Sequence, residues 1–400
     1  MTECFERLRE EVIDTGLCTG CGTCVGVCAS HAISMGYDLD EPEPRLVGDC
    51  TACGSCWEVC PGKEVPLRDL DKRFLGRERD PRQDPIGIYR KCLKAWATDS
   101  FIRSSSSSGG VTSEILRCAL EQDVIDGAII AGWNDGPPYW RCRPLVVTKP
   151  EDVRLGVRTA MMMVPNNAAI SEAVLERGLR RVAVVGLPCH IHGIRKLQQG
   201  DRPPVFARAI KFTIGLFCAS AYYAEGTRHL LMEVGGIPSL DDVVAIDYRG
   251  GQPPGGLVAM TKDRRILHIA TKHEYTWHFL APVSYKRDRC LMCVDFASEL
   301  ADVSVGDIFQ DANSPNRNVV ATIARTPVGE EMVDLARQCG KIAVEPHDPH
   351  LIPASGTGWE SKKHAGMYRL IQRKAHGWPV PNYQYPAEII MLPRRLSFPS

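Results

Sequence analysis

Two cysteine runs near the N-terminus constrain this chain more than any other feature of its sequence. Each run spaces four cysteines by two, two and three residues, and the second run ends directly before Pro61. The runs are Cys18, Cys21, Cys24 and Cys28, then Cys50, Cys53, Cys56 and Cys60. The short gaps let three sulfurs of one loop face a single iron–sulfur cluster while the fourth reaches across to a second cluster. The spacing therefore predicts two [4Fe–4S] clusters, one held by Cys18, Cys21, Cys24 and Cys60 and the other by Cys50, Cys53, Cys56 and Cys28.

Zinc sites and disulfides are alternative explanations of these thiols, and both fit less well. Structural zinc sites pair one Cys-x2-Cys with a distant second pair rather than repeating three gaps. A disulfide framework is typical of short secreted chains, whereas this chain has 17 cysteines in 400 residues and no apolar signal segment in residues 1–17. We therefore expect a cytoplasmic protein of a reducing, anaerobic cell.

Composition excludes two further classes of protein. Lys and Arg total 48, as do Asp and Glu, so there is no basic excess that would indicate nucleic-acid binding. No stretch approaches the roughly 18 apolar residues of a membrane-spanning helix, although attachment to a membrane-bound partner stays open. A hydrophobic content of 44% in 400 residues is enough for two or three domains.

The chain divides into four parts by composition. Residues 1–66 hold both cysteine runs and predict an α+β domain of the bacterial two-cluster ferredoxin type. Residues 67–87 are dense in charge and predict a linker, because they offer little apolar surface to bury. Residues 88–345 alternate predicted helices with apolar strands and indicate an α/β domain. Residues 346–400 show no core of their own and predict a docking tail.

Within the α/β part, the pattern predicts strands at 92–97, 125–132 and 181–186 and helices at 111–122 and 167–177.

Five serines and two glycines at 104–110 lead directly into the first predicted helix. Free N–H groups at a helix N-terminus, the positive end of the helix dipole and serine hydroxyls together can bind phosphate. A flexible serine-rich linker explains the run equally well. Its position between a predicted strand and a helix favours phosphate binding.

Four more cysteines lie downstream in the α/β part. Cys189 and Cys218 follow predicted strands, and Cys290 and Cys293 form a Cys-x2-Cys pair. Four thiolates are the number that a third [4Fe–4S] cluster needs, and α/β sheets place their sites at the carboxyl ends of strands. A zinc site with four cysteine ligands is the alternative.

These motifs resemble the beta-subunit family of coenzyme F420-reducing hydrogenases and F420H2 dehydrogenases, over residues 89–339. The resemblance rests on several motifs in chain order. They are Ser-Ser-Gly-Gly-Val-Thr at 107–112, Val-Ile-Asp-Gly-Ala-Ile at 124–129, Gly-Leu-Pro-Cys-His-Ile-His-Gly-Ile-Arg-Lys at 186–196, Gly-Leu-Phe-Cys at 215–218, Cys-Leu-Met-Cys-Val-Asp-Phe at 290–296 and Glu-Leu-Ala-Asp-Val-Ser-Val-Gly at 299–306.

The resemblance implies that the α/β domain binds FAD and a [4Fe–4S] cluster and that coenzyme F420 is its substrate. It makes Cys189, Cys218, Cys290 and Cys293 the ligands of the third cluster. The residues implied to hold FAD are Ser107, Ser108, Gly109, Gly110, Val111, Thr112, Arg158, Asn166, Gly186 and Pro188. Those implied to act on the flavin are Arg158, His190 and His192, although a histidine beside a cluster is as often a plain hydrogen-bonding neighbour.

The sequence departs from the family pattern at two places. Relatives usually have Gly-Thr/Ser-Lys-Tyr before x-Pro-Asn, and this chain reads Gly-Val-Arg-Thr at 156–159 before Val-Pro-Asn at 164–166. The missing tyrosine changes what shields the flavin ring. Residues 307–316 replace a Gly-Ser-Pro-Asp-Gly-Trp segment, which puts the identity of the hydride donor in question.

The implied cofactors define the expected function. A deazaflavin transfers two electrons as hydride while a cluster passes one, so a flavin is needed between them. We expect an electron-transfer subunit that links F420 to three [4Fe–4S] clusters and to a hydrogenase, formate dehydrogenase, heterodisulfide reductase or F420H2 dehydrogenase partner. One alternative is a free-standing ferredoxin-dependent reductase of an organic substrate such as a tetrapyrrole. A second is an electron-wiring module without flavin.

Overall fold

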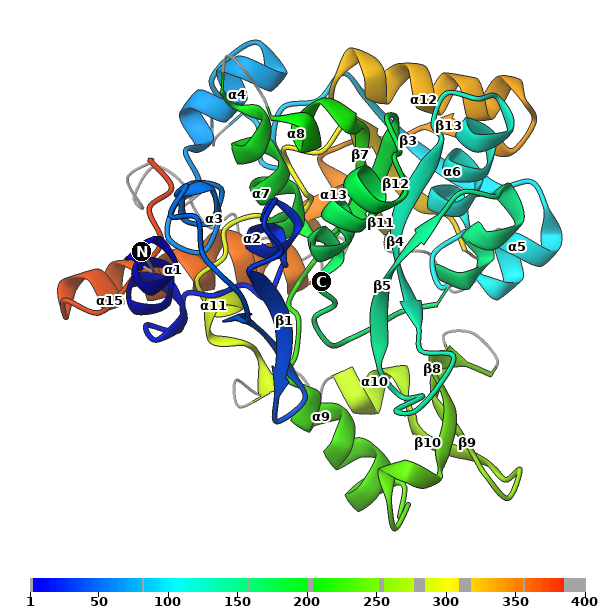
Figure 1. Ribbon diagram of the computed structural model, residues 1–400. Helices are drawn as coiled ribbons and strands as arrows, with labels where there is room; N and C mark the ends of the chain where they lie inside the picture. The colour runs from blue at the N-terminus through cyan, green and yellow to red at the C-terminus, as the bar shows by residue number, and fades with distance from the viewer. Residues whose placement is uncertain are drawn as a thin grey trace.

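The computed structural model describes residues 3–80, 83–156, 158–200, 204–251, 255–276, 285–308, 318–354 and 357–384 (Figure 1). In these ranges no helix has both the length and the apolar character needed to cross a membrane.

An eight-stranded sheet carries the fold, with the strand order β13-β3-β12-β11-β7-β6-β4-β5. Its centre is parallel and consists of β11 (Val303–Asp307), β7 (Ile210–Leu216), β6 (Val182–Gly186) and β4 (Gly127–Trp133). Antiparallel strands flank this centre: β12 (Val320–Ala324), β3 (Lys91–Ala97) and β13 (Ile342–Pro346) on one side and β5 (Cys142–Val147) on the other. The predicted α/β class and the three predicted strands are confirmed.

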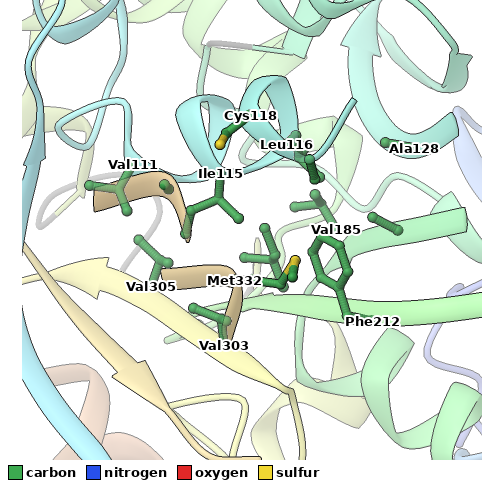
Figure 2. Packing of buried hydrophobic residues seen from close by; sticks show 14 of the residues in the cluster. Val111, Ile115, Leu116, Cys118, Ala128, Val185, Phe212, Val303, Val305 and Met332 are labelled. Carbon is green, nitrogen blue, oxygen red and sulfur yellow. The ribbon is translucent and has the colours of Figure 1, made fainter. Parts of the chain in front are cut away.

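Helices cover both faces of this sheet because its buried strands alternate their side chains between the faces. Ala183 and Val185 of β6 join the cluster packed under α6 (Val111–Glu121) and α12 (Pro327–Gln338) (Figure 2). Their neighbours Val182 and Val184 pack instead with α7 (Pro188–Gln198) and α8 (Val205–Ala209). The helix predicted at 111–122 is thus confirmed. The helix predicted at 167–177 is confirmed as one continuous helical segment, in which a 3₁₀ turn η3 (Asn166–Ala169) runs through Ile170 and Ser171 into a π-helical turn η4 (Glu172–Glu176).

The N-terminal unit repeats one local design around its two cysteine runs. Gly22 and Gly54, both with φ of 80°, open the one-turn helices α2 (Thr23–Gly26) and α3 (Ser55–Glu58), which carry Cys24 and Cys56. Glycine adopts this backbone conformation without strain. A hairpin of β1 (Ile33–Asp38) and β2 (Glu41–Leu46) lies between the runs, and α1 (Glu3–Leu8) with the π-helical turn η1 (Arg9–Ile13) precedes them.

This unit packs directly on the α/β domain, backbone against backbone. A Cβ atom placed on Gly26 would lie 1.9 Å from the carbonyl oxygen of Asn167, and one on Gly193 would lie 2.2 Å from Thr23 Oγ1. Asn167 also donates from its backbone N–H to Cys21 O at 3.2 Å and from Nδ2 to Thr23 Oγ1 at 2.9 Å. The two cysteine-bearing parts of the chain therefore share one packed interface.

The segment 67–87 differs from the linker that its charge predicts. It begins with helix α4 (Leu67–Leu75), whose Leu67 and Leu70 are buried, and it buries Asp71 and Arg79 as well. Arg79 Nε lies 2.6 Å from Asp71 Oδ2, and the same guanidinium pairs with Glu299 of the α/β domain. The charges are paired internally, so a high charge content here does not mean exposure to solvent.

Two further pieces complete the fold. A three-stranded sheet of β8 (Val243–Gly250), β9 (Gly256–Thr261) and β10 (Ile266–Thr271) lies beside α9 (Ala224–His229) at one end of the molecule (Figure 1). After α13 (Leu351–Ala354), the C-terminal segment forms α14 (Thr357–Glu360), η9 (Ser361–Gly366) and α15 (Met367–Ala375). Met367, Leu370 and Tyr383 of this segment join the core of the N-terminal unit. The part of the predicted tail that the structure describes thus docks on its own chain.

Candidate iron–sulfur and flavin site

The eight N-terminal cysteines lie in two groups of four. Burial and the nearby thiols of Cys60, Cys21, Cys18 and Cys56 raise the pKa of Cys24 well above its ordinary value. Burial together with Cys53, Cys50 and Cys28 raises the pKa of Cys56 to about 12. We call Cys18, Cys21, Cys24 and Cys60 the first tetrad and Cys28, Cys50, Cys53 and Cys56 the second tetrad. Each tetrad combines three thiols of one run with the last thiol of the other, as the spacing predicts.

Polar groups around the two tetrads are placed to stabilise thiolates. Backbone N–H groups of Gly20, Ala52 and Gly62 each donate to the cysteine two residues earlier, at 3.4 Å. Hydrogen bonds to the sulfurs favour the deprotonated form that binds iron.

The two tetrads differ in their access to solvent. Cys21 and Cys60 of the first tetrad are buried, whereas Cys53 of the second tetrad is exposed. The second tetrad therefore contains the most solvent-accessible thiol of the eight.

The four downstream cysteines line one cavity. Cys189 is the second residue of α7, Cys218 lies just beyond β7, and Cys290 and Cys293 lie in and after α11 (Asp288–Leu291). Burial with Cys21, Cys290, Cys218 and Cys293 raises the pKa of Cys189 well above its ordinary value. We call Cys189, Cys218, Cys290 and Cys293 the third tetrad. Four thiols around one cavity fit the donor set of a [4Fe–4S] cluster. Within the described ranges no three His, Cys, Asp or Glu side chains form a site for a single metal ion.

Loops of the first tetrad form part of the wall of this cavity. Thr19 and Pro61 line it beside the third tetrad. The buried Arg289, from the α/β domain, donates to the carbonyl oxygens of Gly62 at 3.0 Å and Pro61 at 3.2 Å. The first and third tetrads are thus neighbours held in a fixed relation.

His190 and His192, which follow Cys189 on α7, are both buried and hydrogen-bonded. The N–H of Leu187 donates to His190 Nδ1 at 3.0 Å, so Nε2 donates to the carbonyl oxygen of Val164 at 2.9 Å. Burial lowers the pKa of His190 to about 4, which keeps the ring neutral. This geometry leaves no ring nitrogen of His190 for a proton transfer to a flavin and gives the residue a positioning role.

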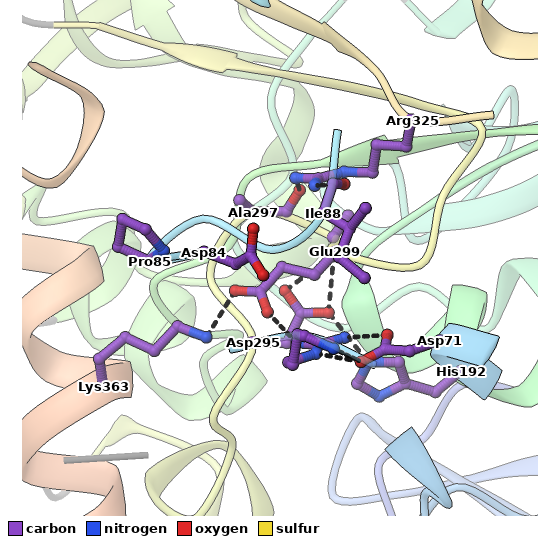
Figure 3. Close-up of polar contacts among 12 residues, drawn as sticks. Asp71, Asp84, Pro85, Ile88, His192, Asp295, Ala297, Glu299, Arg325 and Lys363 are labelled. Carbon is purple, nitrogen blue, oxygen red and sulfur yellow. Dashed lines mark hydrogen bonds and ion pairs between the residues drawn. The ribbon is translucent and has the colours of Figure 1, made fainter. Parts of the chain in front are cut away.

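His192 belongs to a buried polar network rather than to an open site (Figure 3). Its Nε2 lies 2.9 Å from Asp295 Oδ2, and both side chains are buried. The Asp295 carboxylate also accepts from the N–H of Glu299, which in turn pairs with Lys363 at 2.6 Å. The network joins α7 to the loop after the third tetrad and to the C-terminal segment.

The serine–glycine turn opens α6 as the phosphate-binding interpretation requires. Ser104 and Ser105 belong to helix α5 (Ser100–Ser105), so the run is not a flexible linker. Gly109 and Gly110 follow with φ of 65° and 75°, and α6 begins at Val111. Val111 itself is fully buried in the core, so only its backbone is available to a ligand. Ser107 and Thr112 are partly exposed on either side.

Two cations that the sequence did not indicate, Arg249 and Lys272, lie at this turn. Ser108 Oγ donates to Asp307 Oδ1 at 2.6 Å, and Arg249 Nη2 lies 2.8 Å from Asp307 Oδ2. Lys272 Nζ lies 4.0 Å from the same carboxylate, and Arg158 Nε lies 3.8 Å from Asp247. Nothing in the linear sequence relates residue 249 to residue 108, because the two meet only when β8 approaches the end of β11.

Three other residues that the resemblance assigned to FAD lie nearer to the third tetrad. Pro188 lines its cavity, and a Cβ atom on Gly186 would lie 2.5 Å from His190 Cβ. Asn166 donates from Nδ2 to Val185 O at 2.9 Å, and its buried Oδ1 has no partner in the described part of the chain. An unpaired buried acceptor of this kind is costly unless a ligand or water donates to it. Of the two departures from the family pattern, Val157 and residues 309–316 lie outside the described residues.

The fold and the three tetrads define an iron–sulfur oxidoreductase, and comparisons with known proteins agree. Two family models describe the N-terminal and the C-terminal parts of the coenzyme F420 hydrogenase/dehydrogenase beta subunit, and they match residues 92–171 and 179–350. A third model, the 4Fe-4S dicluster domain, matches residues 10–61. The chain belongs to the coenzyme F420 hydrogenase/dehydrogenase beta-subunit family and carries an N-terminal 4Fe-4S dicluster domain.

Individual relatives support this assignment. The coenzyme F420 hydrogenase subunit beta of Methanosarcina barkeri is 30% identical over 271 residues, which cover 66% of this chain and 84% of that protein. Its counterpart in Methanothermobacter thermautotrophicus is 26% identical over 301 residues, or 74% of this chain and 99% of that protein. A chain of the xenon-derivatised F420-reducing [NiFe] hydrogenase complex from M. barkeri has the same fold, with a TM-score of 0.59, 24% identity and coverage of 74% of this chain and 97% of that chain.

Proposed function

We propose that this chain exchanges electrons between coenzyme F420 and three [4Fe–4S] clusters by way of FAD, and delivers them to a partner subunit. One observation carries the proposal: the third tetrad's cavity lies at the carboxyl edge of the parallel strands and is walled in part by loops of the first tetrad. Sites in α/β proteins lie at that edge. When bound, FAD would supply the exchange between hydride and single electrons.

The chain's own residues suit these cofactors. The turn from Ser107 to Thr112 and the cations Arg249 and Lys272 would hold the flavin phosphates, because N–H groups and cations favour anions. Arg158 pairs with Asp247, two residues before Arg249 on β8, and would contribute a further positive charge. The third tetrad would hold the cluster next to the flavin.

The arrangement of the thiols supports an order for the electron path. Cys189 of the third tetrad lies near Cys21 of the first, and Cys24 of the first lies near Cys56 of the second. The second tetrad contains the exposed Cys53. Electrons would therefore pass from the third cluster to the first and then to the second, from which they leave for the partner or enter in the reverse direction.

The donor assignment has a direct test. Anaerobically purified chain, checked for released FAD, is mixed with reduced F420 or with NADH, and reduction of a viologen dye is followed. We expect reduction with reduced F420 only. Dye reduction by NADH and none by reduced F420 would overturn the donor assignment. A purified chain that releases no FAD would overturn the proposal that the chain binds FAD.

A further inference from the structure

The side chain of Lys362 enters the cavity of the third tetrad from the C-terminal segment. It lies in η9, is 2% exposed and lines the cavity beside the four cysteines. Its Nζ donates to the carbonyl oxygen of Cys290 at 2.8 Å. The matched family models end at residue 350, before this residue.

The charge of Lys362 is not balanced by a carboxylate in the part of the chain that the structure describes. The neighbouring Lys363 points into the polar network and pairs with Glu299 at 2.6 Å, whereas the charged or titratable groups that act on Lys362 are Cys293, Cys290, Cys218 and Arg289. A buried ammonium is costly unless an anion lies beside it. The cavity therefore has a fixed positive charge that calls for an anionic occupant.

A [4Fe–4S] cluster with four thiolate ligands is such an occupant. It carries a net negative charge, and reduction adds one more electron to that charge. A nearby cation attracts the reduced form more strongly than the oxidised form, and this attraction is larger in a buried site than in water. Net charge and hydrogen bonds around a cluster are known to set its potential.

We propose that Lys362 raises the reduction potential of the third cluster and so makes that cluster the electron acceptor next to the flavin. This inference rests on the proposed function, because it requires a cluster rather than zinc in the third tetrad. Lys362 acts through its charge and is not a ligand. The C-terminal segment thereby completes the site that the α/β domain builds.

The test is a redox titration of the full chain followed by EPR, with Lys362→Met, Lys362→Arg and the control Lys374→Met. The EPR signal that disappears in Cys290→Ser identifies the third cluster. We expect its midpoint to move to lower potential in Lys362→Met and to stay close to wild type in Lys362→Arg. Lys374 is exposed on α15, so its replacement removes an equal charge without moving the midpoint. An unshifted midpoint in Lys362→Met would overturn the proposal.

Metal analysis distinguishes a failure of this inference from a failure of the proposed function on which it rests. If Lys362→Met lost about four irons per chain and Lys362→Arg kept them, the charge would be needed even for assembly, which supports the proposal. Loss of the cluster in both variants would contradict it. Wild-type chain with about eight irons and one zinc would overturn the proposed function and this inference together, whereas about twelve irons with an unshifted midpoint would overturn only the inference.

Discussion

Cys189 lies near Cys21, although the two cysteines belong to different parts of the chain, and burial together with this neighbouring thiol raises the pKa of Cys189. Cys189 opens α7 at the end of a central strand, and Cys21 lies in the first cysteine loop of the N-terminal unit. Their proximity places the N-terminal unit beside the site of the third tetrad in the α/β domain.

Replacing Cys53 with Ser should block electron transfer only at the second tetrad, where the proposed electron path leaves the chain. Cys53 is exposed and belongs to the second tetrad, away from the cavity of the third. We expect FAD and the third cluster to be retained and reduction of the flavin by the donor to survive, while transfer to the partner or to an external acceptor fails. Stopped-flow absorbance of the flavin, beside a dye assay, measures both. Loss of flavin reduction in this variant would show that the order of the path is wrong.

Replacing Gly26 with Ala should loosen the contact between the N-terminal unit and the α/β domain. The new methyl group would lie 1.9 Å from the carbonyl oxygen of Asn167, and overpacking of this kind costs about 1–3 kcal/mol. We expect a lower midpoint of thermal unfolding and slower electron transfer from the third cluster to the first. Gly48→Ala is the matched control, because its methyl group would meet only Ala32 Cα at an ordinary 3.5 Å. Equal effects of the two replacements would refute the close packing.

Replacing Arg79 with Leu should lower the free energy of unfolding by more than the loss of an exposed ion pair does. Arg79 pairs with the buried Asp71 and Glu299, so its loss removes one positive partner from each of two buried carboxylates, at a cost of about 3–5 kcal/mol. Arg90→Leu breaks a pair with Glu330 that is half exposed, and should cost about 1 kcal/mol or less. Denaturant unfolding of both variants measures the difference. Similar losses in the two would contradict a buried role for the segment 67–87.

Replacing Arg249 with Met should weaken flavin binding. A hydrogen bond to a charged group contributes about 1.5–3 kcal/mol, so the affinity for FAD should fall by roughly tenfold to a hundredfold. Arg265→Met is the control, because Arg265 pairs with Asp263 at the exposed turn between β9 and β10. Equilibrium dialysis of released FAD measures the affinity. Unchanged FAD binding in Arg249→Met would remove this residue from the phosphate site.

The parts of this molecule that the sequence predicts are those set by local spacing. The cysteine gaps predict both N-terminal tetrads, and apolar runs predict β3, β4 and β6, because sulfur reach and strand periodicity act over a few residues. Asp71, Arg79 and Glu299 show the opposite case. The charges of Asp71 and Arg79 are typical of a solvent-exposed linker. The structure buries them through the pairing of Arg79 with Glu299, 220 residues further along the chain. Arg249 and Lys362 reach their sites in the same long-range way, so no local pattern marks them.

The most direct test of the proposed electron path is the metal content of wild type and of Cys290→Ser, because the proposed path runs from the flavin through the third tetrad to the two N-terminal clusters. We expect wild type to hold about twelve irons per chain and no zinc, and the variant to hold about eight irons, since each cluster with four cysteine ligands carries four irons. The flavin should stay bound but become unable to pass electrons onward. About eight irons and one zinc in wild type, with only the zinc lost in Cys290→Ser, would contradict the central claim.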